Sequence, residues 1–305
     1  MAIKLQEQLR IDYPDDERLR HAGIRLGILR LDELHPRVSG NKWFKLEENL
    51  NAAREAGAMR LLTFGGAYSN HLLATAAAAH HLGWESIGMV RGLHAREALT
   101  GTLQECAALG MELVFLSREE YNEKESPRFL DILRSRYPQT WIIPEGGNNE
   151  AGTKGAGSIT RYLPADSTHI AVAIGTGTTF AGIRATLDAR IAMLGFPVMK
   201  GGAYLEAILK DRIPSTQNNW SLCDAYHFGG FGRHTEALLS FMNDFYERHR
   251  IPLDFVYTGK MMCGIFEMIE AGSLPPGSHV IAIHTGGLQG NRSIARHLCY
   301  GPADS

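Results

Sequence analysis

Short apolar runs alternate with longer stretches of helical character along most of the chain. The apolar runs predict strands at 26–31, 59–64, 86–90, 112–116, 141–144, 168–174 and 280–284. Stretches with helical spacing or composition predict helices at 41–55, 71–82, 97–110 and 179–193, and a long polar helix that ends at Tyr137. Strands that alternate with helices of this length favour parallel sheets with right-handed crossovers, so we expect an α/β protein.

The length of the chain bears on the number of domains. The chain has 305 residues, 44% of them hydrophobic, which exceeds the size at which a single core usually suffices. We expect one large domain or two interlocked domains, although no linker rich in Pro, Gly or Ser divides the sequence. A polar, glycine-rich and aromatic stretch at 216–234 fits either a functional loop or an ordinary connection.

Charge and hydropathy exclude several classes of partner. The formal net charge is −2, which gives no indication of a nucleic-acid or anionic-membrane partner. The apolar runs are far shorter than the roughly 20 residues that a membrane span needs, and residues 1–20 contain no apolar signal region. We therefore expect a soluble, cytoplasmic protein.

The cysteines and histidines do not indicate a metal site. The four cysteines are not arranged at C-x-x-C spacing, and the 13 histidines form neither an H-x-x-x-H nor an H-E-x-x-H pattern. We expect no metal and no redox pair. Core or surface packing is the expected role of each thiol, rather than nucleophilic catalysis; the four are Cys106, Cys223, Cys263 and Cys299.

Glycine-rich segments follow several of the predicted strands. Ligands of parallel α/β sheets bind beyond the carboxyl ends of the strands. One such segment is weak evidence, but four that carry hydroxyls or amides suggest one shared pocket. The segments are SGNK (39–42), GGAYSN (65–70), GTGTT (175–179) and HTGG (284–287).

The segment that follows the strand at 168–174 has the composition of a phosphate-binding loop. Its glycines let backbone N–H groups approach an anion, the following helix adds a partial positive charge, and three threonines add hydroxyls. It matches neither a P-loop nor G-x-G-x-x-G, because no Gly-Lys-Ser/Thr follows and Gly182 is displaced from the third glycine position. A monophosphate therefore fits better than a pyrophosphate, and the alternative is a tight turn before a well-capped helix.

Lys42 lies at the predicted start of a helix, where the helix dipole favours anions. This position and partial desolvation are expected to lower its pKa, and a lysine of lowered pKa forms an imine with an aldehyde. Lys45 lies on the same side of the helix. The alternative is a pair of surface lysines near Glu47 and Glu48.

A phosphate cradle, an imine-forming lysine and several hydroxyl donors together point to pyridoxal 5′-phosphate (PLP). The sequence resembles the tryptophan-synthase-β-like family of PLP enzymes (fold type II), and within it the group of 1-aminocyclopropane-1-carboxylate (ACC) deaminase and D-cysteine desulfhydrase. Five motifs of that group occur in order. They are G/S-G-N-K-x-x-K-L-E at 39–47, G-G-x-x-S-N-H/Q at 65–71, the Gly/Thr/Ser loop at 175–179, Y-T/E-G-K at 257–260 and H-T/L-G-G at 284–287.

The resemblance implies roles for residues of the first two motifs. Lys42 would be the Schiff-base lysine. Asn70 would hydrogen-bond the phenolic oxygen of the cofactor, and Ser69 and the turn to His71 would hold the substrate carboxylate. Ser69 would also be a candidate proton carrier, so that Ser69 and Lys42 stay open as alternatives for that task. An anion site at a helix N-terminus would explain why a hydroxyl, an amide and an imidazole share one turn.

The resemblance likewise assigns the later motifs. The phosphate would be held by Gly175, Thr176, Gly177, Thr178 and Thr179. Tyr257 would stand near the substrate. Thr285, with Thr258 close by, would place a hydroxyl near the pyridine nitrogen of the cofactor.

Among the residues that depart from the family pattern, three bear on the reaction. Thr258 and Thr285 stand where ACC deaminases have Glu and Leu, so no carboxylate would keep the pyridine nitrogen protonated. This favours the desulfhydrase-like side of the group. Phe231 occupies the place of a second tyrosine, for which Tyr226 or His227 is a candidate substitute.

The implied reaction is the β-elimination of a small amino acid. A proton is taken from the α carbon, the β substituent leaves, and hydrolysis gives a 2-oxo acid and ammonia. D-Cysteine would also give sulfide, which makes the protein a PLP-dependent carbon–sulfur lyase or deaminase. ACC deaminase activity and a PLP-binding protein without turnover stay as alternatives, whereas a nucleotide-dependent oxidoreductase lacks its G-x-G-x-x-G and acidic ribose ligand.

The resemblance also implies the architecture. We expect two open parallel-sheet α/β domains with the cofactor between them. Residues 1–45 and 149–305 would form a large, discontinuous PLP-binding domain, and 46–148 a small α/β domain. A homodimer is expected from the resemblance alone.

Overall fold

The computed structural model describes residues 9–35, 37, 38 and 40–301. Internal contacts divide the chain into two compact units. Of the described residues, the small unit contains 35, 37, 38 and 42–155, and the large unit contains 9–34, 40, 41 and 156–301. The division predicted from the sequence, 46–148 against the rest, is close to these ranges but stays a prediction.

The large unit is built on a six-stranded sheet with the order β1-β2-β10-β7-β8-β9. All neighbours are parallel except β1, which runs antiparallel to β2. The strands are β1 (Ile11–Asp12), β2 (Arg25–Arg30), β7 (His169–Ile174), β8 (Ala192–Pro197), β9 (Trp220–Leu222) and β10 (His279–His284). Apolar side chains on both faces of the central strands are buried, as a sheet covered on both sides requires.

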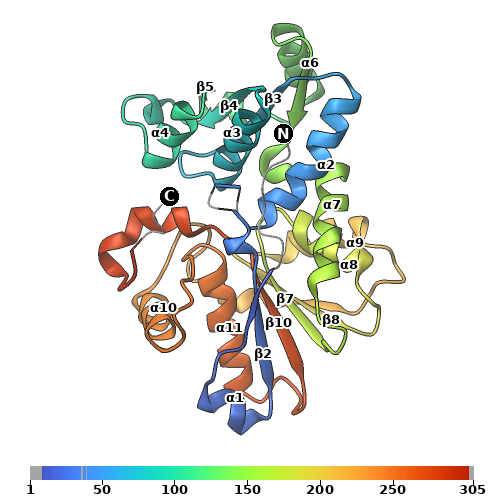
Figure 1. The fold of residues 1–305 in the computed structure, drawn as a ribbon, viewed down its shortest axis with the longest axis vertical. Coiled ribbons are helices and arrows are strands. Elements are labelled where there is room, and N and C mark those ends of the chain that lie inside the picture. The colour runs from blue at the N-terminus through green and yellow to red at the C-terminus, as the bar shows by residue number, and fades with distance from the viewer. Residues whose placement is uncertain (1–8, 36, 39, 302–305) are drawn as a thin grey trace. The chain divides into compact units, whose positions relative to one another are not determined.

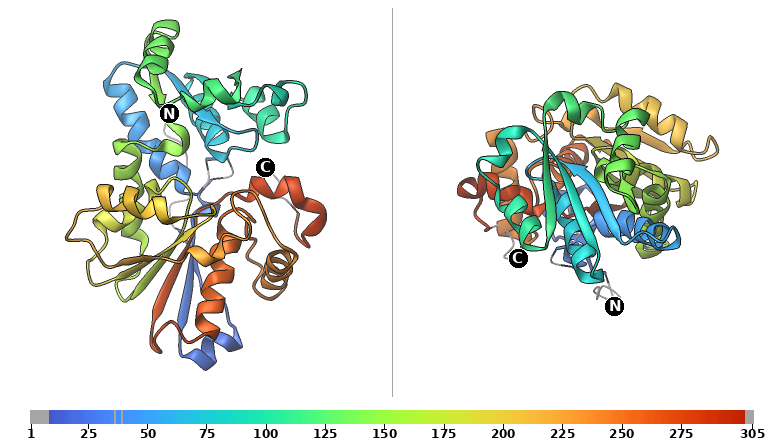
Figure 2. Two further views of the ribbon diagram at one scale, coloured as in Figure 1. Left: turned by 180° about the vertical axis from the view of Figure 1, so that it is seen from behind. Right: turned by 90° about the horizontal axis from the view of Figure 1, so that it is seen from above.

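Helices cover this sheet on both sides. In Figure 1, α10 and α11 lie to one side of the strands and α8 and α9 to the other, and Figure 2 shows the same arrangement from behind. The α-helices of this unit are α1 (Glu17–Ala22), α8 (Thr178–Thr186), α9 (Ala203–Arg212), α10 (Glu236–His249) and α11 (Thr258–Glu270), and α7 (Glu150–Gly157) runs across the unit boundary. The 3-10 helices are η1 (Leu31–Glu33), η4 (Ser158–Tyr162), η5 (Asp224–Tyr226) and η6 (Leu288–His297).

The small unit contains a four-stranded, fully parallel sheet with the order β5-β4-β3-β6. Its strands are β3 (Arg60–Gly65), β4 (Glu85–Arg91), β5 (Met111–Leu116) and β6 (Thr140–Ile143). The helices are α2 (Asn41–Glu55), α3 (Asn70–Leu82), α4 (Gly101–Ala108), α5 (Arg118–Asn122) and α6 (Pro127–Arg136), with 3-10 turns η2 (Leu93–Arg96) and η3 (Glu145–Gly147). The α/β class with two sheets, one fully parallel and one parallel except for β1, is thus confirmed.

Helix α3 shows how composition sets the packing of the small unit. Its run Ala76–Ala79 is buried, and these small side chains let the helix contact β3 and β4 closely. The helix ends at Gly83, whose φ of 68° is left-handed, after the basic pair His80 and His81 in the last turn. No helix among the described residues is long and apolar enough to cross a membrane.

The helix predicted at 179–193 is wrong over its second half. Helix α8 ends at Thr186, and residues 192–197 form strand β8 instead. The guanidinium of Arg184 is fully buried and donates to the carbonyls of Leu187, Asp188 and Ile191, which fixes a turn after the helix. Long-range contacts therefore overrode the helical composition.

The long polar helix predicted to end at Tyr137 is also wrong, because two short helices occur in its place. Ser117 and Glu120 form a capping box at the start of α5. Ser126 then caps α6 by accepting a hydrogen bond from Phe129 N, and Pro127 follows at the first helical position. The Ser-Pro pair interrupts the backbone hydrogen bonds that one continuous helix would need.

Candidate functional site

The large unit brings three predicted segments to one edge of its sheet. Strands β7 and β10 are parallel neighbours, so the segments after Ile174 and His284 begin side by side at their carboxyl ends. Gly40 lies against the second of these segments: its φ is +67°, and a Cβ there would be 2.0 Å from the carbonyl oxygen of Thr285. Asn41 N donates to the same oxygen at 3.3 Å. The residues just before Lys42 are therefore tied to the end of β10.

The segment Gly175–Thr179 has the geometry of an anion cradle. Gly177 has a φ of 83° and precedes α8 without providing a side-chain cap, so the first-turn amides of the helix face the loop. The hydroxyls of Thr176 and Thr178 lie 3.0 Å apart. A ligand with several acceptor oxygens, such as a phosphate, suits this set of donors.

Asn41 connects this cradle to the lysine motif. Its amide Nδ2 donates to Thr179 Oγ1 at 2.7 Å, and both side chains are buried. Lys42 follows in the chain and is half-buried in the first turn of α2. The sequence analysis quoted Asn41 within a motif but gave it no role, because its partner is distant in sequence.

A second support of the site is Asp254, which the sequence analysis missed. Its carboxylate is fully buried and accepts from the backbone amides of Val256, Tyr257 and Thr258 at 2.7–3.0 Å. It also accepts the hydroxyl proton of Thr258 at 2.6 Å. An aspartate just ahead of a helix start is a capping signal that the sequence does contain.

The hydrogen bonds to Asp254 fix the positions of the Thr258 hydroxyl and the Tyr257 ring. The Thr258 hydroxyl gives its proton to Asp254 and accepts from Asp254 N at 2.8 Å, so it serves the turn. The ring of Tyr257 lies next to the phosphate loop, since a Cβ on Gly175 would be 3.3 Å from Tyr257 Cε1. Tyr257 is half-buried, whereas Thr258 is fully buried.

The segment that carries Thr285 is held by a buried charged network. His284 Nε2 is 2.8 Å from the carbonyl of Pro252, and His284 Nδ1 is 3.1 Å from Asp32 Oδ1. Arg30 donates two hydrogen bonds to Asp32, at 2.7 and 2.9 Å, and several acidic partners keep the pKa of its guanidinium above the usual value despite burial. A buried network of hydrogen bonds and ion pairs of this kind helps to fix the position of the residue that follows it.

In the small unit, Ser69 and Asn70 form the start of α3. Ser69 Oγ accepts from Leu72 N at 3.3 Å, which caps the helix. Gly65 is required beneath it, because a Cβ there would be 2.5 Å from Ser69 Oγ. The buried carboxamide oxygen of Asn70 has no hydrogen-bond partner among the described residues. A buried side-chain oxygen without a partner leaves a hydrogen-bond acceptor available for a ligand.

His71 lies on the same turn and is kept neutral. Burial and, to a smaller extent, the positive charges of Lys42 and Lys45 lower its pKa to about 3. Lys45 Nζ donates to the carbonyl of Gly146 at 2.9 Å. Two lysines and a neutral imidazole thus belong to one neighbourhood of the small unit.

The predicted residues therefore gather in two groups. The large unit holds one group near the ends of β7 and β10: Gly175, Thr176, Gly177, Thr178, Thr179, Tyr257, Thr258 and Thr285. The small unit holds the other, consisting of Lys42, Ser69, Asn70 and His71. The peptide bond between Asn41 and Lys42 joins the two groups covalently.

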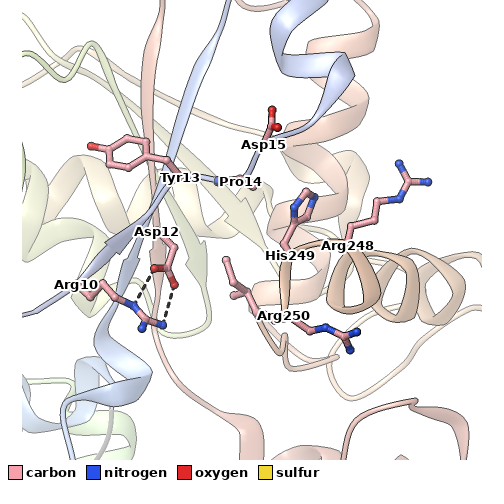
Figure 3. Close-up of a pocket in the computed structure, with 9 residues that line it drawn as sticks. Arg10, Asp12, Tyr13, Pro14, Asp15, Arg248, His249 and Arg250 are labelled. Carbon is pink, nitrogen blue, oxygen red and sulfur yellow. Dashed lines mark hydrogen bonds and ion pairs between the residues drawn. The ribbon is translucent and has the colours of Figure 1, made fainter.

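A surface hollow and two cysteines lie apart from the predicted site residues or give no sign of a reactive site. A surface hollow of about 390 Å³ beside β1 and the end of α10 is lined by Arg10, Asp12, Tyr13 and Arg248, among others, and by none of the predicted residues (Figure 3). Burial raises the pKa of the Cys106 thiol to about 12 and that of Cys223 to about 11. In the part of the chain that the structure describes, no three His, Cys, Asp or Glu side chains are grouped to hold a metal.

Two α/β units with sheets of mainly parallel strands, together with a loop suited to bind an anion, are typical of α/β enzymes that bind a phosphorylated cofactor. Within that class, the chain belongs to the family of pyridoxal-phosphate dependent enzymes, whose model matches residues 17–286. The predicted family and cofactor are thereby confirmed.

Similar proteins narrow the group. A protein of Pyrococcus horikoshii, provisionally named 1-aminocyclopropane-1-carboxylate deaminase, is 30% identical over 288 residues, covering 89% of this chain and 87% of that protein. The mitochondrial bifunctional D-cysteine desulfhydrase/1-aminocyclopropane-1-carboxylate deaminase of Arabidopsis thaliana is 30% identical over 296 residues, covering 88% and 73%. The crystal structure of an ACC deaminase homologue superposes with a TM-score of 0.81 at 28% identity, covering 96% and 94%. The tryptophan-synthase-β-like fold type is confirmed.

The residues present fit PLP. The loop Gly175–Thr179 offers amides and hydroxyls to a phosphate, and Gly177 has the left-handed backbone that such a loop uses. In the small unit, the side-chain oxygen of Asn70, which lacks a hydrogen-bond partner among the described residues, would offer a polar contact to a substituent of the cofactor ring. Lys42 would supply the amine that reacts with the aldehyde of the cofactor.

Proposed function

We propose that this protein is a PLP-dependent lyase or deaminase that releases a β substituent from a small amino acid, giving a 2-oxo acid and ammonia. The observation that carries this proposal is the 2.7 Å hydrogen bond from Asn41 to Thr179, which links the phosphate cradle to the residue preceding Lys42. The names of the similar proteins, a deaminase and a bifunctional desulfhydrase/deaminase, support the same reaction class.

The chain's own groups divide the work of the reaction. Bound PLP supplies an electron sink for charge that develops at the α carbon of the substrate. Lys42 would hold the cofactor through its amine, and the same amine would accept the proton from the α carbon of the substrate. Ser69 and the amides of its turn orient the substrate carboxylate at the N-terminus of α3. Ser69 is the alternative proton carrier, and Tyr257 stands beside the substrate.

The threonine at the end of β10 decides between two reactions. Thr285 would offer a hydroxyl, and no carboxylate, to the cofactor nitrogen, while Thr258, whose hydroxyl is bonded to the buried Asp254, supports the turn at the start of α11. A hydroxyl does not keep the nitrogen protonated, so the electron sink is weaker. Elimination tolerates a weaker sink, because a good leaving group departs as charge develops. Opening a cyclopropane ring has no such leaving group.

A direct test compares two substrates on the purified holoenzyme. We expect pyruvate from β-chloro-D-alanine or D-cysteine, and no appreciable 2-oxobutanoate from ACC. Faster turnover of ACC would contradict the claim that Thr285, in place of a carboxylate, disfavours ring opening. It would support the second candidate function, ACC deaminase, which the names of the similar proteins favour. Absence of turnover across a panel of D- and L-amino acids would leave a PLP-binding protein without activity.

Three further expectations stay predictions. They are a cytoplasmic location, a homodimer, and the position of the cofactor between the two domains. Light scattering on the purified protein measures the second of these, and a mass equal to that of one chain would contradict it.

A further inference from the structure

A strained loop of the large unit follows β9. Phe228 has a φ of 47°, a left-handed conformation that a bulky residue adopts only when its surroundings impose it. Gly229, Gly230 and Gly232 follow with φ of 91°, 111° and 66°. The loop conformation is therefore not the intrinsic preference of its residues, and strain of this kind accumulates at ligand sites.

A buried lysine holds this loop in place. Lys260 Nζ donates to the carbonyl oxygens of His227 at 2.8 Å and of Gly230 at 2.7 Å. Its side chain lies in α11 and is fully buried. Burial lowers its pKa to about 8, against the opposing charge of Asp254, so at neutral pH the ammonium is still mostly protonated. Burial of an ammonium group costs free energy, and here hydrogen bonds to two loop carbonyls offset part of that cost.

The loop presents an aromatic ring beside the candidate site. Phe231 is 59% exposed, and its ring meets that of Tyr257 edge-on, with centroids 6.1 Å apart and an interplanar angle of 74°. Tyr257 in turn lies next to Gly175 of the phosphate loop. A phenyl ring that is exposed at this place offers apolar surface to whatever occupies the site.

We propose that Phe231, positioned by Lys260, is the apolar wall against which the substrate side chain packs, so that the site selects amino acids whose side chain ends in an apolar group. This inference rests on the proposed function, since it takes Tyr257 and the Gly175 loop as the substrate site. A hydroxyl packed against a phenyl ring loses hydrogen bonds to water without replacement, whereas a methyl group gains by leaving water.

The test uses two ligands of equal size that have no leaving group. Norvaline and homoserine differ by a terminal methyl or hydroxyl, and their dissociation constants are measured from the change in visible absorbance of the holoenzyme, with both enantiomers. We expect norvaline to bind roughly tenfold more tightly. In Phe231→Tyr the ratio falls toward one, because the phenol pairs with the hydroxyl, whereas Phe231→Leu keeps the preference.

Tyr13→Leu is the matched control. Tyr13 is another exposed aromatic residue of the large unit, 43% exposed, and it lies by His279 at the opposite end of β10, on the hollow of Figure 3. This variant should leave the ratio of the two dissociation constants unchanged.

The positioning role of Lys260 is tested with the same ratio. Lys260→Met removes both donors and is expected to lower the norvaline preference severalfold, while Lys260→Gln, which keeps an amide donor, restores part of it. If Lys260 only stabilised the fold, its replacement would weaken the binding of both ligands by the same factor. If Lys260→Met does not fold, Lys260→Gln is read against the wild type, and an unchanged ratio in it contradicts the positioning role.

The inference and the proposed function fail in different ways. Equal affinities for the two ligands, no absorbance change with either, or an unchanged ratio in Phe231→Tyr would overturn the inference. Pyruvate release from β-chloro-D-alanine measures the proposed function separately, so a protein that discriminates the ligands without turnover would support the wall and contradict the lyase.

Discussion

The side-chain amide of Asn41 donates a 2.7 Å hydrogen bond to Thr179 Oγ1, and this contact ties the glycine-rich loop after β7 to the start of α2. Asn41 is also bonded through its backbone to Thr285. Asn41 therefore contacts both the loop Gly175–Thr179 and the end of β10, and it directly precedes Lys42 in the chain.

Removing that amide should weaken cofactor binding. Asn41→Ala leaves Thr179 without its donor, and a hydrogen bond of this kind contributes about 1 kcal/mol, so the dissociation constant of PLP should rise by about fivefold to tenfold. The measurement is a titration of the apoprotein with PLP. Asn51→Ala, at an exposed position of the same helix, is the control and should bind PLP as the wild type does.

Gly40 should tolerate no side chain. In Gly40→Ala the new Cβ would meet the carbonyl of Thr285 at 2.0 Å, so the backbone must move away from β10. Gly57→Ala introduces the same left-handed strain, at a φ of +69°, but with nothing within 4 Å of the new Cβ.

The two alanine variants separate strain from contact. Left-handed strain alone costs about 1–2 kcal/mol, which is the expected loss in the free energy of unfolding for Gly57→Ala. Gly40→Ala should lose more than this and should also bind PLP more weakly. Equal losses in denaturant unfolding would contradict the close approach of Gly40 to Thr285.

The buried imidazole of His71 should make stability depend on pH. Its pKa is lowered to about 3, so as the pH falls through 6.5 the unfolded chain takes up a proton that the folded chain does not. The free energy of unfolding therefore decreases as the pH is lowered from 6.5 to 3, and this group contributes up to about 1.4 kcal/mol per pH unit.

A neutral replacement should remove this dependence. The difference in unfolding free energy between wild type and His71→Gln should shift in favour of the variant as the pH is lowered from 6.5 to 4.5. His81→Gln, an exposed position of the same helix, is the control. Parallel pH profiles for wild type and His71→Gln would show that the imidazole is not held neutral.

Asp254 should matter more than other acidic residues of its unit. Asp254→Asn replaces a carboxylate that accepts from three amides and one hydroxyl, so roughly 2–3 kcal/mol of unfolding free energy should be lost. The substrate Michaelis constant should also rise, because Tyr257 loses its fixed position. Asp244→Asn breaks only the exposed pair with Arg248 and should cost about 0.5 kcal/mol or less. Similar losses for the two variants in denaturant unfolding would be inconsistent with this role.

Local pattern and motif spacing were sufficient for much of the fold. The strand predicted at 280–284 corresponds to β10, and the helix predicted at 41–55 has the observed bounds, because apolar periodicity and a glycine before the helix are local signals. Strand β8 was missed since Ala192 and Met193 favour helices on composition, and pairing with β7 decides otherwise.

The supports of the candidate site were less accessible to sequence analysis. Asn41 and Thr179 are separated by 138 positions, and no local pattern connects them. Lys260 was quoted within a motif, but its bonds to the carbonyls of His227 and Gly230 depend on a loop whose backbone the sequence does not specify. Both residues act through tertiary contacts, which only the folded chain reveals.

The most direct test of the central claim is the identity of the lysine that carries the cofactor. The purified protein is incubated with PLP, reduced with borohydride, digested and analysed by mass spectrometry. We predict that the pyridoxyl group is found on Lys42, and that Lys42→Ala prevents the labelling while retaining the fold. Labelling of Lys45 or Lys260, with Lys42 unmodified, would contradict the assignment of Lys42 and with it the proposed site.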